Sequence, residues 1–229
     1  MRFRKDKERE ISRVFRSTDE ARITYNRMSR FYDVLAGAGE KRLVQVGVQK
    51  LNVSEGEIVL EIGFGTGNCI VDFARSVGSS GKVFGIDISE GMKSRAEQKV
   101  KKASLTERVE LTCGDALSLP YKAEFFDAVF SSFTLELFDT PEIPQVLLEC
   151  NRVLSENGRI CIVSMSRKGK IGLMVNVYEW LHRKFPRSVD CRPIYVEDAV
   201  RDAGFTIMDT TAATMWGLPA EIVLAGKQV

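Results

Sequence analysis

A glycine-rich turn directly after an apolar run is the feature of this chain best suited to chemistry. The run from Val59 to Ile62 predicts a buried strand, and Gly63, Gly65 and Gly67 follow at alternate positions before a helical pattern begins. Glycines at this spacing let the backbone turn tightly and approach a ligand closely, as nucleotide-type cofactors require at the carboxyl ends of parallel strands. The turn therefore predicts a cofactor site.

The residues around the turn separate it from the dinucleotide-binding fingerprint. Asn68 follows a G-x-G-x-G spacing, so the third glycine of G-x-G-x-x-G is absent. Asp87 ends the next predicted strand, 20 residues after Gly67. A carboxylate there can accept hydrogen bonds from two ribose hydroxyls. A charge placed at a helix N-terminus near Ser89 is the competing interpretation of Asp87.

Short β-branched or apolar runs alternate with amphipathic stretches from about residue 56 onward, which predicts a parallel sheet with helices on both faces. The predicted parallel strands are 58–62, 83–86, 109–112, 128–131 and 159–164. Two further runs, 205–211 and 221–225, are too close for a crossover helix, so we expect an antiparallel hairpin. The fold class is α/β, with a doubly wound, mostly parallel, seven-stranded sheet.

Helical spacing of apolar residues predicts the elements that cover this sheet. The expected helices are 21–32, 40–51, 70–77, 143–154, 171–185 and 196–203. Ser89 is the expected N-cap of the helix after the second strand, and residues 155–158 carry turn chemistry. We expect one domain over 1–229, with a helical cap at 1–51, folding over the carboxyl edge, and a catalytic core at 52–229. That core holds a helical insertion at about 168–192.

Composition narrows the class of protein further. The 33 Lys and Arg residues against 31 Asp and Glu residues give a net charge of +2, so no global field attracts nucleic acid. The five cysteines form no C-x-x-C pair, which is typical of reduced thiols rather than a disulfide framework or a zinc site. No apolar run approaches a membrane span. We expect a cytoplasmic protein that needs no metal.

Four motifs in order carry a resemblance to a known family. They are Glu61 to Gly67, Gly85 to Ser89, Gly114 to Ala116 with Leu119-Pro120, and Phe126 to Val129. Their order and spacing resemble class I S-adenosylmethionine-dependent methyltransferases, and the chain is most similar to the ubiquinone and menaquinone biosynthesis C-methyltransferase group. The resemblance covers about 25–227. It departs at 156–158, where the family usually has Pro-Gly-Gly, and at 133–138.

The resemblance implies S-adenosylmethionine as the cofactor and a role for each matching residue. Gly63, Gly65 and Gly67 would cradle the methionine and ribose parts, with Glu61 supporting the loop or the amino group. Asp87 would hold the ribose hydroxyls. The remaining contacts would be Ile88 on an adenine face, Asp115 at the adenine amino group, the Ala116 backbone at a ring nitrogen, and Ser132 beside the methionine portion.

The acceptor is less specified than the cofactor. We expect a small hydrophobic or amphipathic molecule, quinol-like or lipid-like, with Tyr25, Tyr32 and Phe133 as substrate or lid residues; packing is an equal interpretation of Tyr32. His182, the only histidine, is not assigned to catalysis. Residues 171–185 have an apolar helical spacing followed by basic residues, which leaves a lid, a packing helix and peripheral membrane contact open.

Two other functions stay open at this stage. One is a cofactor-binding protein without transferase activity, and the other is an NAD-dependent oxidoreductase, which the missing third glycine disfavours. The sequence does not choose between carbon, nitrogen and oxygen as the methylated atom, and it does not set the oligomeric state.

Overall fold

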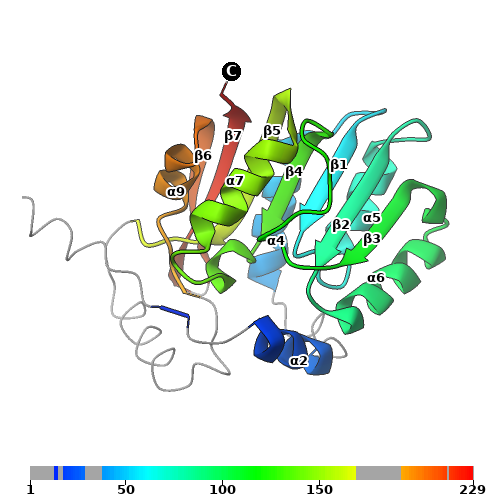
Figure 1. Cartoon of the computed structure of the whole chain (residues 1–229), viewed down its shortest axis with the longest axis horizontal. Coiled ribbons are helices and arrows are strands. Elements are labelled where there is room, and N and C mark those ends of the chain that lie inside the picture. Colours follow the sequence, from blue (N-terminus) through cyan, green and yellow to red (C-terminus); the bar gives the residue numbers. More distant parts are fainter. Residues whose placement is uncertain (1–12, 15–17, 29–37, 169–191, 216, 229) are drawn as a thin grey trace, which may run out of the picture.

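The computed structural model describes residues 13–14, 18–28, 38–168, 192–215 and 217–228. Its centre is a seven-stranded sheet with the order β3-β2-β1-β4-β5-β7-β6 (Figure 1). The strands are β1 Ile58–Ile62, β2 Lys82–Asp87, β3 Val109–Cys113, β4 Phe126–Ser132, β5 Leu154–Met165, β6 Phe205–Met215 and β7 Leu218–Lys227.

Strand direction confirms the predicted fold class. β1 pairs in parallel with β2 and with β4, β2 with β3, and β4 with β5, whereas β7 is antiparallel to both β5 and β6. The chain moves outward from β1 to β3 and then returns to the other side of β1 as β4. The carboxyl ends of β1 and β4 therefore flank the topological switch point, where open α/β sheets bind ligands.

Helices cover both faces of this sheet (Figure 1). They are α2 Thr18–Met28, α4 Ala38–Leu51, α5 Asn68–Ser76, α6 Glu90–Lys102, α7 Ile143–Val153 and α9 Val196–Asp202, with short 3-10 turns η1 Thr106–Arg108 and η2 Leu135–Leu137. Buried apolar side chains of α4, α5 and α6 form one core cluster, and those of α7 and α9 form the other. The amphipathic spacing in the sequence thus marks the sheet-facing sides.

Two expectations about local structure are corrected. The helix expected at 40–51 packs on a face of the sheet rather than over its carboxyl edge. The close approach is seen at Gly47, where an added Cβ would lie only 2.5 Å from Val163 Cγ2 of β5, so the absence of a side chain lets the helix contact the sheet. The turn expected at 155–158 lies inside β5. There the register jumps from Phe126↔Leu154 to Ala128↔Arg159, so the polar residues form an irregularity within the strand instead of a turn that ends the preceding helix.

Ser89 caps α6 as expected, since its hydroxyl accepts a hydrogen bond from Met92 N at 3.1 Å. The expected helix at 171–185 and the last part of the one at 21–32 lie outside the described residues, as do Tyr32 and His182. Four cysteines within the described ranges, Cys69, Cys113, Cys150 and Cys161, are free thiols.

Candidate functional site

The turn between β1 and α5 has the backbone that its glycines predict. Gly63, Gly65 and Gly67 have φ angles of +70°, +51° and +80°. At Gly65 an added Cβ would meet no atom of the described residues within 4 Å, and the residue lines a cavity, so a side chain there would enter space that a ligand can use. At Gly67 a Cβ would lie 2.6 Å from Ala96 Cβ, which shows how closely α5 approaches α6.

Asp87 at the end of β2 fixes the other side of this turn. Its Oδ2 accepts from Gly65 N and its Oδ1 accepts from Ser89 N, both at 2.9 Å. Burial raises the pKa of Asp87 to about 6, although the two backbone hydrogen bonds oppose the shift. The carboxylate is therefore held in a fixed orientation between the glycine turn and α6.

A first cavity of about 330 Å³ opens beside Asp87 at the carboxyl ends of the strands. Its lining includes these predicted site residues: Tyr25, Gly63, Gly65, Asp87, Ile88, Asp115, Ala116, Ser132 and Phe133. Gly67 lies in the turn but does not line the cavity, and Glu61 faces a different one. Sequence reasoning therefore found half of this lining. Among the residues that it missed are Met92, Thr134 and Glu142, which carried no local motif.

One end of the first cavity is formed by the segment after β3. Ile88 from the β2 end and Ala116, which is 4% exposed, supply apolar surface there. Asp115 Oδ1 accepts from Leu117 N at 3.0 Å, which holds the carboxylate in its own loop. A planar aromatic ligand could lie between such apolar groups while its polar edge meets Asp115.

The opposite end is formed by the segment after β4. Phe133 has a φ of 48° and donates its N–H to Val163 O at 2.7 Å. Just beyond it, the fully buried Glu136 accepts from the Ser164 hydroxyl at 2.8 Å and from Met165 N at 3.2 Å. Burial raises the pKa of Glu136 to about 7. These bonds tie the β4 loop to the end of β5.

Helix α2 lies outside the sheet, beyond one end of its strands (Figure 1), and it contributes to the lining of the cavity. Asn26 Oδ1 accepts from the Ser89 hydroxyl at 2.7 Å and from Gly91 N at 2.9 Å, so α2 is docked on the first turn of α6. Ala21 and Tyr25 of the same helix line the cavity. Tyr25 therefore lies at the cavity, and its role as a substrate or lid residue stays a prediction.

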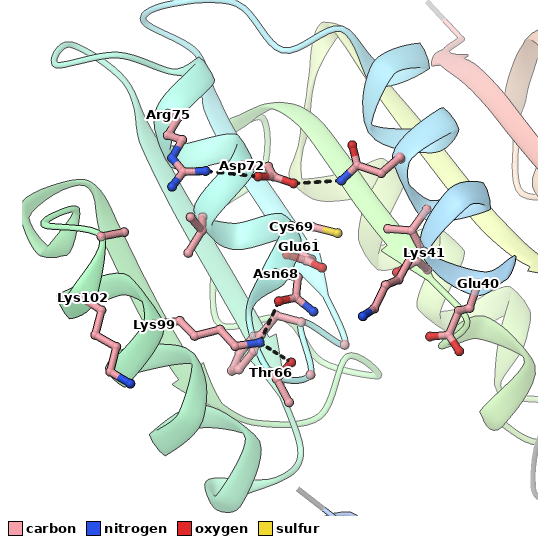
Figure 2. Close-up of a pocket in the computed structure, with 18 residues that line it drawn as sticks. Glu40, Lys41, Glu61, Thr66, Asn68, Cys69, Asp72, Arg75, Lys99 and Lys102 are labelled. Atoms are coloured by element: carbon pink, nitrogen blue, oxygen red, sulfur yellow. Dashed lines mark hydrogen bonds and ion pairs between the residues drawn. The ribbon is translucent and has the colours of Figure 1, made fainter. Parts of the chain in front are cut away.

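A second, larger cavity of about 870 Å³ lies between α4, α5 and α6 (Figure 2). It meets the first cavity at Gly63, Gly65 and Ser132, which line both. Glu61 lines it and is 2% exposed, and its Oε2 has no hydrogen-bond partner among the residues that the structure describes. Burial first, and then the charge of Asp87, raises the pKa of Glu61 well above its usual value.

Basic side chains from three helices line the second cavity, and Arg75 is the one that α5 contributes (Figure 2). Lys99 of α6 donates to Thr66 Oγ1 at 2.8 Å and to Asn68 Oδ1 at 2.7 Å. Lys41 of α4 and Lys102 of α6 line the same space. The sequence analysis missed this set because α4 and α6 are distant in the chain, and only their packing brings the lysines to one cavity.

Comparisons with known proteins agree with this geometry. Residues 59–158 match the family described as a methyltransferase domain. The chain is 32% identical over 152 residues to a demethylmenaquinone methyltransferase of Lactobacillus johnsonii, covering 62% of this chain and 59% of the relative. It is 30% identical over 178 residues to one of Alkalihalophilus pseudofirmus, covering 78% of this chain and 71% of the relative.

The chain thus spans less than two thirds of the length of the first of these relatives. Among solved structures, the [4+2]-cyclase SpnF superposes with a TM-score of 0.75 at 18% identity, covering 93% of this chain and 98% of that one. At that identity the superposition supports the fold alone.

Proposed function

Because this chain belongs to the class I S-adenosylmethionine-dependent methyltransferases, we propose that it transfers a methyl group from S-adenosylmethionine to a small hydrophobic or amphipathic acceptor of the quinol type. One observation carries the proposal. The glycine turn, the oriented Asp87 carboxylate and Asp115 line a single cavity at the topological switch point of the sheet.

The residues present fit this cofactor. Asp87 offers an ionisable carboxylate to a pair of ribose hydroxyls, and it is already oriented by two backbone N–H groups. The absent Cβ of Gly65 leaves room for close approach of a ligand to the turn. Ile88 and Ala116 supply apolar surface for an adenine ring, and Asp115 supplies an acceptor for its amino group.

A bound sulfonium cofactor supplies an already activated methyl group, so the chain's own task is to align the acceptor and exclude water. Ser132 lies where the two cavities meet, and the tethered β4 loop fixes Phe133 beside it. Helix α2, docked through Asn26, covers the site from the solvent side. We assign alignment and water exclusion to these elements and name no general base.

The apolar wall of the first cavity supports a quinol-type acceptor. Phe133, Leu137 and Phe138 follow one another along the β4 loop and line the cavity. An aromatic acceptor ring gains contact area and offset stacking from such side chains. The relatives' name, demethylmenaquinone methyltransferase, points to the same class of acceptor.

The test is transfer of label from methyl-labelled S-adenosylmethionine. The purified chain is incubated with a chemically reduced demethylnaphthoquinol that carries a short prenyl chain, and the product is identified by mass spectrometry. The proposal predicts a singly methylated quinol, with label on carbon, and loss of the product with Asp87→Ala. A parallel incubation contains phosphatidylethanolamine in place of the quinol. Label in this lipid but not in the quinol would contradict the acceptor class.

Three expectations from the sequence remain part of this proposal. They are a single domain with a helical cap, a cytoplasmic location, and peripheral membrane contact through residues 171–185, which lie outside the described residues. Within the described part of the chain, no helix is long and apolar enough to span a membrane. Salt-sensitive co-sedimentation with anionic vesicles tests the membrane contact, and failure to co-sediment at low salt would remove it.

A further inference from the structure

A buried arginine lies against the wall of the first cavity. Arg192 is 1% exposed, and its Nη2 donates to the backbone oxygen of Phe138 at 2.6 Å. Phe138 belongs to the apolar wall to which we assign the acceptor. The segment that carries Arg192 is held at the carboxyl end of β5, because Ile194 N donates to Met165 O at 3.1 Å. The guanidinium group therefore lies beside the acceptor's part of the cavity.

Most of the hydrogen-bonding capacity of Arg192 is unused. A guanidinium group carries five N–H donors. The Nε and Nη1 atoms of Arg192 are buried, and neither has a hydrogen-bond partner among the described residues. Burial lowers the pKa of Arg192 to about 10, so the side chain stays charged at neutral pH. A buried cation with unused donors is costly unless an anion or another hydrogen-bond acceptor joins it.

The carboxylates around Arg192 are bonded to other groups. Asp139, Glu136 and Glu142 act on its pKa through their charges, but none of them is hydrogen-bonded to it in the described part of the chain. Asp139 pairs with Arg13, whose Nη2 lies 2.6 Å from Asp139 Oδ2. Glu136 accepts from two groups of β5, and Glu142 Oε2 accepts from Asp139 N at 2.8 Å. These acids stabilise the charge of the guanidinium group without occupying its donors.

We propose that Arg192 binds an ionised oxygen of the acceptor, so that a quinol-type ring lies in the first cavity with one deprotonated hydroxyl group toward the guanidinium group. The inference rests on the proposed function and deepens it, because it names the charge state of the acceptor that the site selects. Arg192 does not itself line the first cavity, and a change of side-chain rotamer at Phe138 or Arg192 completes the contact.

This contact makes Arg192 a specificity-determining residue. Hydrogen bonds between a guanidinium group and an ionised oxygen are stronger than those to a neutral oxygen, and exclusion of water strengthens them further. Arg192 therefore separates acidic acceptors from uncharged ones of the same shape. Selection of an already ionised oxygen also agrees with a site to which we assign no general base.

Calorimetric titration with two probes of one ring system tests this inference. 2-Hydroxy-1,4-naphthoquinone is ionised at neutral pH, and 2-methoxy-1,4-naphthoquinone is its uncharged counterpart. Both are titrated into the chain loaded with S-adenosylhomocysteine. We expect the unaltered chain to bind the ionised probe about tenfold more tightly than the uncharged one, the scale of one hydrogen bond to a charged group.

Arg192→Gln removes the charge but keeps an N–H donor for the Phe138 oxygen. We expect it to weaken binding of the ionised probe about tenfold and to leave binding of the uncharged probe and of S-adenosylhomocysteine unchanged. Arg192→Lys keeps the charge without the planar fork of donors, and it restores part of the preference. Arg201→Met is the matched control, because Arg201 is an arginine of α9 that is 54% exposed and lines neither cavity. It leaves all three affinities unchanged.

The outcomes separate this inference from the proposed function. Equal binding of the two naphthoquinones by the unaltered chain overturns the inference, as does an Arg192→Gln variant that weakens both equally or neither. The proposed function stands in each of these cases. Failure of the unaltered chain to bind either naphthoquinone, while it binds S-adenosylhomocysteine, overturns the inference together with the acceptor class. Failure to bind S-adenosylhomocysteine overturns the proposed function itself.

Discussion

Replacing Gly65 by alanine has two expected effects that can be measured separately. One is a loss of folding stability from backbone strain, and the other is a loss of ligand affinity from steric overlap at the turn. The residue has a φ of +51°, and an added Cβ would project into cavity space with no atom within 4 Å in the part of the chain that the structure describes. Its N–H, which donates to Asp87, is kept in the variant. The substitution therefore costs backbone strain in folding and a steric overlap only when a ligand is bound.

The expected loss of folding stability and the expected loss of ligand affinity differ in size. An L-residue in the left-handed region costs about 1–2 kcal/mol, and the stiffer unfolded chain offsets about 0.4–1 kcal/mol of it. A net loss of about 1 kcal/mol lowers Tm by about 2–4 °C in a chain of this size. A methyl group forced into an occupied site costs about 1–3 kcal/mol, which weakens binding roughly 5- to 150-fold.

Gly204→Ala is the matched control. Gly204 follows α9 and has a φ of +85°. An added Cβ there would also meet no described atom within 4 Å, but Gly204 lines neither cavity. Thermal unfolding and titration with S-adenosylhomocysteine are measured for both variants. Both Tm values fall similarly and only Gly65→Ala loses affinity. Unaltered affinity in Gly65→Ala would refute ligand contact at this turn.

Three further predictions follow from the hydrogen bonds of the site. If only ionised Asp87 holds the ribose, S-adenosylhomocysteine binding is about tenfold weaker at pH 5 than at pH 7.5, because the pKa is about 6, and Asp87→Asn removes this pH dependence. Asn26→Ala undocks α2 and weakens binding several-fold by titration, whereas Ile23→Ala, at an exposed position of the same helix, does not. Glu136 binds its proton more tightly when folded than when unfolded, so stability falls as pH rises from about 4.5 through 7. Urea unfolding shows this fall, on the order of 1–3 kcal/mol, and Glu136→Gln reduces it, while the raised pKa values of Asp87 and Glu61 keep part of the pH dependence.

Each of these predictions has an outcome that contradicts it. Flat binding of the unaltered chain from pH 5 to pH 8 would remove the ionised Asp87 from ribose recognition. Equal effects of Asn26→Ala and Ile23→Ala would assign the loss to general destabilisation of α2. A stability curve that rises from pH 5 to pH 8 in the unaltered chain, and is unchanged by Glu136→Gln, would mean that Glu136 is not buried as described.

The predictable features of the fold were those encoded locally. Apolar runs such as Val59–Ile62 and the glycines after them lie within a few residues of one another, and the position of Asp87 follows from strand order alone. The resemblance to the methyltransferase family predicted cofactor contacts for Asp115 and Ser132, and both residues line the first cavity. Whether each residue binds the cofactor as assigned remains a prediction.

The features that were missed depend on packing between distant segments. Residues 156–158 have turn chemistry, but the pairing of β5 with β4 on both sides of them keeps them within the strand. Lys41 and Lys99 share a cavity only because α4 and α6 lie on the same face of the sheet. Docking of Asn26 on α6 joins residues 63 and 65 positions apart, which periodicity does not show.

The most direct test of the central claim is calorimetric titration of the unaltered chain with S-adenosylmethionine, S-adenosylhomocysteine and NAD in parallel. The cavity at the switch point, with its oriented Asp87 and open Gly65, predicts that the first two ligands bind at one site per chain and that NAD does not. Binding of NAD alone, or of none of the three, would contradict the assignment of this site to a methyltransferase cofactor.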